Sequence, residues 1–191
     1  MKQGATRHAL ADRKDDLYET PAEATRALMR NVPLPKWIWE PAAGRGAIAR
    51  ELMSAGHRVI CTDLVKHDDA DEYIESGIDF LMERRPPSVQ AIVTNPPYKL
   101  ADEFVRHGLS LNLPVIVLLR LMAIEGTKRS DIVDGHLHEM WAGRERLPFM
   151  HRDGWDGPKN SNSGAPFAWF VFRPEKRAGP IALHRMSWRA P

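Results

Sequence analysis

The chain has 191 residues, of which 43% are hydrophobic and 27% charged, and its formal net charge is +2. These values are typical of a water-soluble globular protein with a sizeable core, and no apolar run approaches the roughly 20 residues that span a bilayer. The only cysteine, Cys61, excludes an internal disulfide and fits a reducing cytoplasm, while the eight histidines show no metal-binding spacing. We therefore expect a cytoplasmic protein without a membrane or metal partner.

The N-terminal third alternates helical and strand patterns. Residues 1–17 are polar and are expected to form a flexible arm. Residues 20–23 (Thr-Pro-Ala-Glu) have the form of a capping box with proline at the first helical position, which predicts that a helix begins here. The apolar pattern then predicts a strand at 37–39, a helix at 48–55 and a second strand at 58–62.

The alternation continues through the middle of the chain. We expect a short helix at 71–74 and an extended piece at 78–81, followed by a strand at 91–94. Helical spacing predicts a helix at 101–111. Residues 115–119 (Val-Ile-Val-Leu-Leu) are the most apolar run and are typical of a central parallel strand.

The C-terminal part is less regular. Residues 142–166 are rich in Gly, Asn, Ser, Asp and Arg and predict a long irregular loop, which is often functional in a compact domain. Closing strands are expected at 167–172 and 181–184, with residues 174–191 forming a C-terminal extension. The alternation of β and α elements predicts a single α/β domain over the whole chain, with an open, mostly parallel sheet and helices on both faces.

A glycine turn leaves the first predicted strand at residues 40–46 (Glu-Pro-Ala-Ala-Gly-Arg-Gly). Gly44 and Gly46 allow a ligand to approach the backbone closely, as in a Rossmann-type turn. Asp63 ends the next strand, where a carboxylate can bind ribose hydroxyls. The fingerprint of a dinucleotide site is incomplete, and Glu40 would sit poorly beside a pyrophosphate. An acid there suits a cofactor with an ammonium and a sulfonium, namely S-adenosylmethionine.

Two further features fit this cofactor. The N-terminus of the helix that begins near Thr20 favours an anion such as the methionine carboxylate. Asp79 offers an acceptor for an adenine amino group, and Phe80 a ring to pack against its face. Each residue also has an ordinary structural interpretation: Thr20 as a cap, Asp63 as a surface acid, Asp79 as a turn residue and Phe80 as part of the core.

Residues 95–98 read Asn-Pro-Pro-Tyr and follow the strand predicted at 91–94. The Asn95 side-chain oxygen and the Pro96 carbonyl can accept hydrogen bonds from a planar amino group and favour its attack on a methyl donor. Pro96 and Pro97 stiffen the corner, and Tyr98 offers a flat face for the ring that bears the amine. The alternative is an ordinary turn at the end of a strand.

Basic residues gather in the C-terminal quarter: residues 141–191 hold nine Lys and Arg against four Asp and Glu. Arginine beside aromatic residues is compatible with nucleic-acid contact, although a solvated face over core tryptophans explains the same pattern. The candidate residues for binding the backbone of a nucleic-acid substrate are Lys99, Arg144, Arg146, Arg152, Trp155 and Lys159.

Together these motifs resemble the S-adenosylmethionine-dependent amino methyltransferases, in particular the DNA N6-adenine type and its small phage-like members. The resemblance covers residues 18–173 and is carried by 18–21 (Tyr-Glu-Thr-Pro), 40–46, Asp63, Asp79-Phe80 and 95–98, with 167–172 as the closing strand. It implies a Rossmann-like class I fold, with a seven-stranded sheet whose last strand is antiparallel.

The resemblance also implies roles for individual residues. The cofactor would contact Tyr18, Thr20, Pro21, Glu40, Ala42, Gly44, Gly46, Asp63, Asp79 and Phe80. The catalytic residues would be Asn95, Pro96, Pro97 and Tyr98, and a first-position Asn favours adenine over cytosine as a family tendency. The implied reaction is methyl transfer to the N6 amine of adenine in DNA.

Three alternatives stay open from the sequence. The same four-residue motif serves methylation of RNA or of a protein glutamine, and no separate target-recognition domain is visible. A catalytically idle cofactor- or nucleic-acid-binding module is the second alternative. A nicotinamide-dependent oxidoreductase is disfavoured by the incomplete glycine fingerprint.

Overall fold

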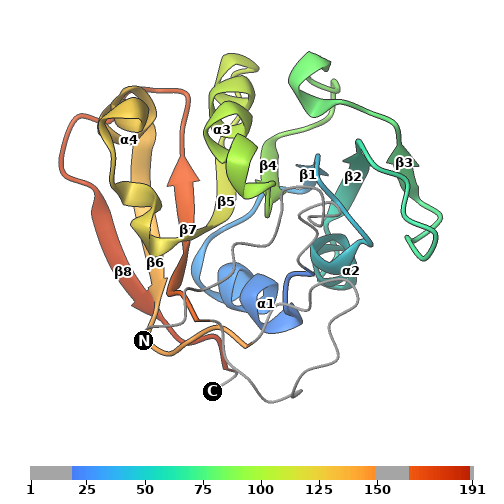
Figure 1. Cartoon of the computed structure of the whole chain (residues 1–191), viewed down its shortest axis with the longest axis horizontal. Helices are drawn as coiled ribbons and strands as arrows, with labels where there is room; N and C mark the ends of the chain where they lie inside the picture. The colour runs from blue at the N-terminus through green and yellow to red at the C-terminus, as the bar shows by residue number, and fades with distance from the viewer. Residues whose placement is uncertain (1–18, 149–163, 190–191) are drawn as a thin grey trace, which may run out of the picture.

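A single eight-stranded sheet organises the chain. The computed structural model describes residues 19–148 and 164–189. The strands lie in the order β3-β2-β1-β4-β5-β7-β6-β8 (Figure 1). Their bounds are β1 (Trp37–Glu40), β2 (Arg58–Asp63), β3 (Ile74–Ser76), β4 (Ala91–Thr94), β5 (Val115–Arg120), β6 (Leu137–Gly143), β7 (Phe167–Phe172) and β8 (Ala182–Met186).

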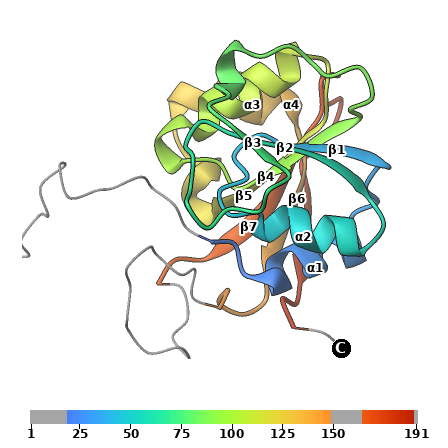
Figure 2. The same cartoon turned by 90° about the vertical axis from the view of Figure 1, so that its right-hand side faces the viewer.

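Helices cover both faces of this sheet. They are α1 (Ala22–Asn31), α2 (Ala47–Ser54), α3 (Ala101–Ser110) and α4 (Ser130–His136), with 3-10 turns η2 (Phe80–Met82), η3 (Tyr98–Leu100), η4 (Leu121–Ile124) and η5 (Thr127–Arg129). Figure 2 shows α1 and α2 on one side of the sheet and α3 and α4 on the other.

The central strand β5 shows why the two layers form. Val115, Val117 and Leu119 pack into the core beneath α3 and α4. Ile116 and Leu118 point the other way and join the core beneath α1 and α2. Successive side chains of a strand face opposite sides of the sheet, so an uninterrupted apolar run requires cover on both faces.

The predicted open, mostly parallel α/β sheet is confirmed. β1 pairs in parallel with β2 and β4, and β4 with β5. The strand predicted at 167–172 is β7, and it is antiparallel to both β5 and β6. The sheet has eight strands rather than seven, because β8 adds to β6 in parallel. The expected C-terminal extension is thus partly an integral strand.

Several local predictions were wrong. Residues 71–73 form no helix and residue 74 begins β3, while residues 80 and 81 belong to the 3-10 turn η2 instead of an extended piece. β6 and α4 were not predicted, and β6 occupies the first two residues of the loop expected at 142–166. The capping box is also absent: Pro21 is the N-cap of α1, without a side-chain cap.

The end of β6 is fastened to the C-terminal segment by Glu145 and Trp188. The Glu145 carboxylate accepts hydrogen bonds from the Trp188 backbone N–H at 2.9 Å and from the Ser187 hydroxyl at 2.6 Å. The Trp188 indole N–H donates to the Glu145 carbonyl at 2.9 Å, and its ring is 1% exposed. Arg30 of α1 donates to the carbonyls of Ser187 and Arg189. These contacts tie three distant segments together.

Gly143→Ala is expected to lower the free energy of unfolding by about 1–3 kcal/mol, because a Cβ at this position would overpack the contact with the Trp188 indole. That Cβ would lie 2.2 Å from the indole Nε1 and 2.5 Å from Cε2. Chemical denaturation measures the change. Gly135→Ala in α4 is the matched control, since its Cβ meets nothing within 4 Å; an equal loss in both variants would contradict this account.

Candidate active site

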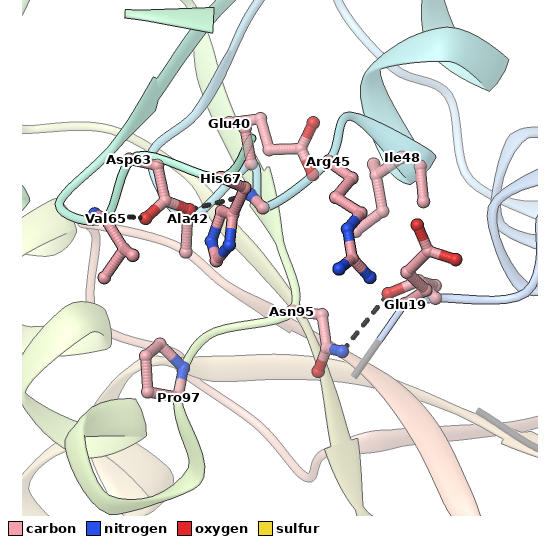
Figure 3. Close-up of a pocket in the computed structure, with 14 residues that line it drawn as sticks. Glu19, Glu40, Ala42, Arg45, Ile48, Asp63, Val65, His67, Asn95 and Pro97 are labelled. Atoms are coloured by element: carbon pink, nitrogen blue, oxygen red, sulfur yellow. Dashed lines mark hydrogen bonds between the residues drawn. The ribbon is translucent and has the colours of Figure 1, made fainter. Parts of the chain in front are cut away.

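The main candidate site is a cavity at the carboxyl ends of β1, β2 and β4, beside the segment that leads into α1 (Figure 3). Parallel strands that end at one edge of a sheet bring their following loops together there, and ligands of open α/β sheets bind in that crevice. The lining residues are Glu19, Thr20, Glu40, Ala42, Ala43, Gly44, Arg45, Ala47, Ile48, Asp63, Val65, His67, Asn95 and Pro97.

The glycine turn is built as the sequence predicts. Gly44 and Gly46 have positive φ angles of 55° and 89°, a region that disfavours residues with a Cβ. A Cβ on Gly46 would also lie 2.5 Å from an Asp71 carboxylate oxygen. Gly46 is the N-cap of α2, so the turn delivers the chain directly into the helix.

Asp63 holds the turn to the loop after β2. One carboxylate oxygen accepts a hydrogen bond from the Gly44 N–H at 2.7 Å, and the other from the Val65 N–H at 2.8 Å. The side chain lines the cavity and is largely buried. Each carboxylate oxygen has two lone pairs, so acceptor capacity is left for a ligand. The ribose role of Asp63 stays a prediction.

Two ion pairs fasten the same loop to the glycine turn and to α2. Arg45 bonds to Asp69 at 2.5 Å, and Arg50 to Asp71 at 2.7 Å. Arg50 also donates to the Arg45 carbonyl at 2.7 Å. These contacts hold the β2–β3 loop at the rim of the cavity.

Glu40 is the most unusual group in the cavity, because its side chain is 1% exposed and one of its oxygens, Oε2, has no hydrogen-bond partner among the described residues. Burial raises the pKa of Glu40 well above its usual range, and a backbone hydrogen bond from Ala49 only partly opposes the rise. The nearby charge of Asp63 raises this pKa further. A buried acid without a cation is costly, and a bound cation would favour its ionised form.

Asn95 lies across the cavity from the glycine turn, and its orientation is set by Thr20. The Asn95 Nδ2 donates to the Thr20 hydroxyl at 3.1 Å, drawn as a dashed line in Figure 3. In this arrangement the amide nitrogen faces Thr20 and Oδ1 faces away from it. Thr20 therefore serves the Asn-Pro-Pro-Tyr corner rather than the cap of α1.

The corner separates two environments. Pro97 lines the main cavity, whereas Tyr98 lines a second cavity with residues that follow β5. Pro96 is buried between them. The Arg120 guanidinium lies 4.7 Å from the centroid of the Tyr98 ring, a cation–π contact.

Other predicted cofactor residues are not brought into the cavity. Among the described residues that line it, Pro21, Gly46, Asp79 and Phe80 are missing. Phe80 is 2% exposed and packs against Trp39, Phe104 and His107. This position does not support stacking on a cofactor base, because the core already encloses the ring. Asp79 is exposed, and one of its oxygens caps η2 through the Leu81 N–H. Tyr18 lies outside the described residues.

The predicted nucleic-acid contacts are only partly described. Arg144 and Arg146 are exposed beyond the end of β6 and line neither cavity, and Lys99 is exposed beside Tyr98. Arg152, Trp155 and Lys159 lie outside the described residues.

Several lining residues were not predicted from the sequence. Among them are Arg45 and His67, which have polar side chains, and Val65, whose backbone N–H donates to Asp63. Arg45 lies between the two turn glycines, a position that could have been read from the motif. Val65 and His67 follow Asp63 without a pattern of their own, so only the folded loop reveals them.

Two negative findings apply to the described ranges 19–148 and 164–189. None of their helices is long and apolar enough to cross a membrane. They also contain no group of three or more His, Cys, Asp or Glu side chains placed to hold a metal ion.

The strand order, the antiparallel β7 and the cavity at the strand ends define the Rossmann-like class I methyltransferase fold. Solved structures with this fold are similar to the chain. A proposed RNA methyltransferase from Pyrococcus horikoshii superimposes with a TM-score of 0.58 at 15% identity, over 82% of this chain and 85% of that one. No protein-family model matches the sequence, and no curated protein sequence matches it.

Two further structures share the fold at similar distance. A modification subunit of a proposed type I restriction enzyme from Vibrio vulnificus has a TM-score of 0.54 at 16% identity, over 92% of this chain and 48% of that one. This chain thus spans about half the length of that subunit. A dimethyladenosine transferase from Plasmodium falciparum has a TM-score of 0.51 at 12% identity, over 83% of this chain and 63% of that one. At these identities the likeness establishes the fold.

Proposed function

We propose that the protein transfers a methyl group from S-adenosylmethionine to the exocyclic N6 amine of adenine in DNA. The observation that carries the proposal is the orientation of Asn95. The amide Nδ2 donates to Thr20, and we assign the buried Oδ1 as the acceptor for a substrate amine in the main cavity, which Asn95 lines. An acceptor fixed in this way suits a planar amine whose lone pair must be turned toward an electrophile.

The main cavity fits the cofactor. The ammonium and sulfonium of S-adenosylmethionine would place positive charge close to the buried Glu40, which forms no ion pair among the described residues. Backbone around Gly44 can approach the cofactor closely, and Asp63 can accept from its ribose. These residues would hold the cofactor between α2 and the Asn95 corner.

The cofactor supplies an electrophilic methyl group on a positively charged sulfur. The chain contributes orientation: Asn95 and the Pro96 carbonyl would accept from the amine, and Tyr98 would stack on its ring. As the nitrogen–methyl bond forms, the sulfur–methyl bond breaks and the sulfur keeps its electron pair. The positively charged nitrogen then releases a proton to water. No covalent enzyme intermediate is needed, in agreement with burial that raises the pKa of the Cys61 thiol.

Adenine is favoured over the N4 amine of cytosine by the Asn at the first position of the motif, as a family tendency that the resemblance implies. The solved structures that share this fold include a dimethyladenosine transferase, a modification subunit of a proposed restriction enzyme and a proposed RNA methyltransferase. RNA and protein glutamine remain the rival substrates, and a catalytically idle binding module the rival of another class.

Incubation with tritiated S-adenosylmethionine and separate pools of DNA, RNA and protein tests the substrate. We expect label in DNA. Label confined to RNA or to protein would replace the proposed substrate while keeping methyl transfer. If the protein binds S-adenosylmethionine in calorimetry and labels none of the pools, the binding module is the better description.

Glu40→Gln is expected to have opposite effects on binding and on stability. Loss of the carboxylate should weaken S-adenosylmethionine binding by roughly tenfold or more, because a charge-assisted contact is lost. Without ligand, the substitution should raise the free energy of unfolding at neutral pH by about 1 kcal/mol, because a buried charge is removed.

The pH dependence follows from the raised pKa of Glu40. The stability that protonated Glu40 contributes to the folded state is fully present below the unfolded-state pKa. It is lost as the pH rises through the folded-state pKa. Cofactor affinity should run the other way and weaken as the pH falls through that raised value. Calorimetry and denaturation across pH measure both effects. Glu75→Gln, at an exposed position of β3, is the control, and an affinity of Glu40→Gln equal to wild type would contradict the assignment.

A further inference from the structure

The second cavity lies beyond the Asn-Pro-Pro-Tyr corner, on the side away from the glycine turn. Its lining includes Tyr98, Asp102 at the start of α3, Arg120 at the end of β5, and Met122 and Arg129 beyond that strand. β4 and β5 are parallel neighbours, so their carboxyl ends meet at one edge of the sheet. This register brings Arg120 to the ring of Tyr98.

Arg120 differs from the other arginines near this cavity in having no carboxylate partner among residues 19–148 and 164–189. Arg129 pairs with Asp102 at 3.2 Å, and Arg106 pairs with Asp131 at 2.7 Å. The Arg120 side chain is exposed, and within the described residues its only recorded contact is the stack on Tyr98. Its positive charge is therefore available to an anion.

We propose that Arg120 is a substrate-contacting residue that selects a nucleic acid, by binding a phosphate next to the base that Tyr98 accepts. The inference rests on the proposed function, because it assigns the substrate class of the same site. A guanidinium is planar, stacks on aromatic rings and binds phosphate through two parallel hydrogen bonds. A base can therefore enter against Tyr98 while the guanidinium turns to the neighbouring phosphate.

A protein glutamine fits this arrangement less well. The glutamine side chain is neutral and offers no anion to Arg120. Its entry would disrupt the cation–π contact between Arg120 and Tyr98 without giving Arg120 a new electrostatic partner. A nucleic acid provides both a flat ring and a charge.

Exposed apolar side chains near the cavity agree with contact to unstacked bases. Met122, which lines the cavity, is 63% exposed, and Leu100 on η3 is 40% exposed. Both would be covered by a ligand that extends over the corner. Bases present apolar faces that such side chains can contact.

The test uses Arg120→Gln, which removes the charge, and Arg120→Lys, which keeps the charge without the planar fork. Arg58→Gln is the matched control, because the Arg58 guanidinium stacks on Trp37 at 5.0 Å at the opposite end of the sheet. Binding of short fluorescein-labelled DNA and RNA strands is followed by anisotropy over a range of salt concentrations. Calorimetry with S-adenosylmethionine and thermal denaturation verify that each variant keeps its cofactor site and its fold.

Arg120→Gln should weaken strand binding by roughly tenfold and reduce the salt slope by about 1, as expected for one lost phosphate contact. Arg120→Lys should keep the slope and lose part of the affinity, and Arg58→Gln should match wild type. Comparison of the DNA and RNA strands tells which backbone is preferred. The KM for the strand should rise more than kcat falls.

Unchanged strand affinity and salt slope in Arg120→Gln would overturn the inference. So would methyl transfer to protein alone at a rate that Arg120→Gln leaves unaltered, although methyl transfer itself would then stand. Strand binding that depends on Arg120, without methyl transfer to any acceptor, would instead refute the proposed function and support the inference.

Discussion

Asn95→Ala is expected to lower kcat for methyl transfer by about 10²–10³-fold, the usual cost of removing a hydrogen-bond acceptor or donor aligned with the reacting group. Asn95 is bonded to Thr20 and is assigned to the substrate amine rather than to the cofactor, so the affinity for S-adenosylmethionine should change little. Single-turnover kinetics and calorimetry separate the two effects.

Thr20 supplies the matched variants for this prediction. Thr20→Ser keeps the hydroxyl that accepts from Asn95 and should stay near wild-type activity. Thr20→Val removes it at nearly constant volume, leaves the amide without its anchor, and should lose a smaller part of kcat than Asn95→Ala. Equal activity of Thr20→Val and Thr20→Ser would contradict the positioning role. A loss of cofactor binding in Asn95→Ala as large as the loss of kcat would contradict the assignment of Asn95.

Asp63→Ala is expected to have the opposite effect to Asn95→Ala. It should weaken the affinity for S-adenosylmethionine more than it lowers kcat. The substitution removes the acceptor of the Gly44 and Val65 N–H groups as well as the proposed ribose contact. Unsatisfied buried donors cost about 1–3 kcal/mol, so the free energy of unfolding should fall by a similar amount.

The two contributions of Asp63 can be distinguished. Asp63→Asn keeps one oxygen acceptor and should recover part of the stability, since one of the two backbone bonds survives. Calorimetry with S-adenosylmethionine and denaturation without it give the affinity and the stability separately. If Asp63→Ala bound the cofactor as tightly as wild type, Asp63 would be a structural residue of the turn alone.

The sheet could be predicted from sequence where apolar runs are long or bounded by clear turns. Residues 91–94 and 167–172 were placed at their observed bounds as β4 and β7. β6 was missed because His138, Glu139 and Trp141 interrupt its apolar pattern and its burial is mostly intermediate. Its strand character comes from the partners β7 and β8 on its two sides, which no local pattern reports.

The site could be predicted where the backbone itself requires the residue. Gly44 and Gly46, predicted to form a Rossmann-type turn after a strand, adopt positive φ angles that glycine tolerates best. Thr20 was expected to cap a helix, yet its hydroxyl is used by Asn95, 75 residues away. Phe80 was expected at a ligand and lies in the core, because an aromatic residue beside an acid has the same sequence pattern in either place. Both outcomes depend on tertiary contacts, which form only when segments distant in the sequence come together.

Arg120 illustrates the same limit. In the sequence Arg120 is the polar end of an apolar strand, whereas the basic residues of the C-terminal quarter are clustered and were therefore predicted to contact nucleic acid. The fold places it on Tyr98, whereas the exposed Arg144 and Arg146 line neither cavity.

Mass spectrometry of nucleosides tests the central claim most directly. DNA incubated with the protein and S-adenosylmethionine carrying a deuterated methyl group is digested to nucleosides, with Asn95→Ala as the control. The account predicts labelled N6-methyldeoxyadenosine with the wild type and a strongly reduced amount with the variant. Label on another DNA base, or none in DNA while RNA or protein is labelled in parallel, would contradict it.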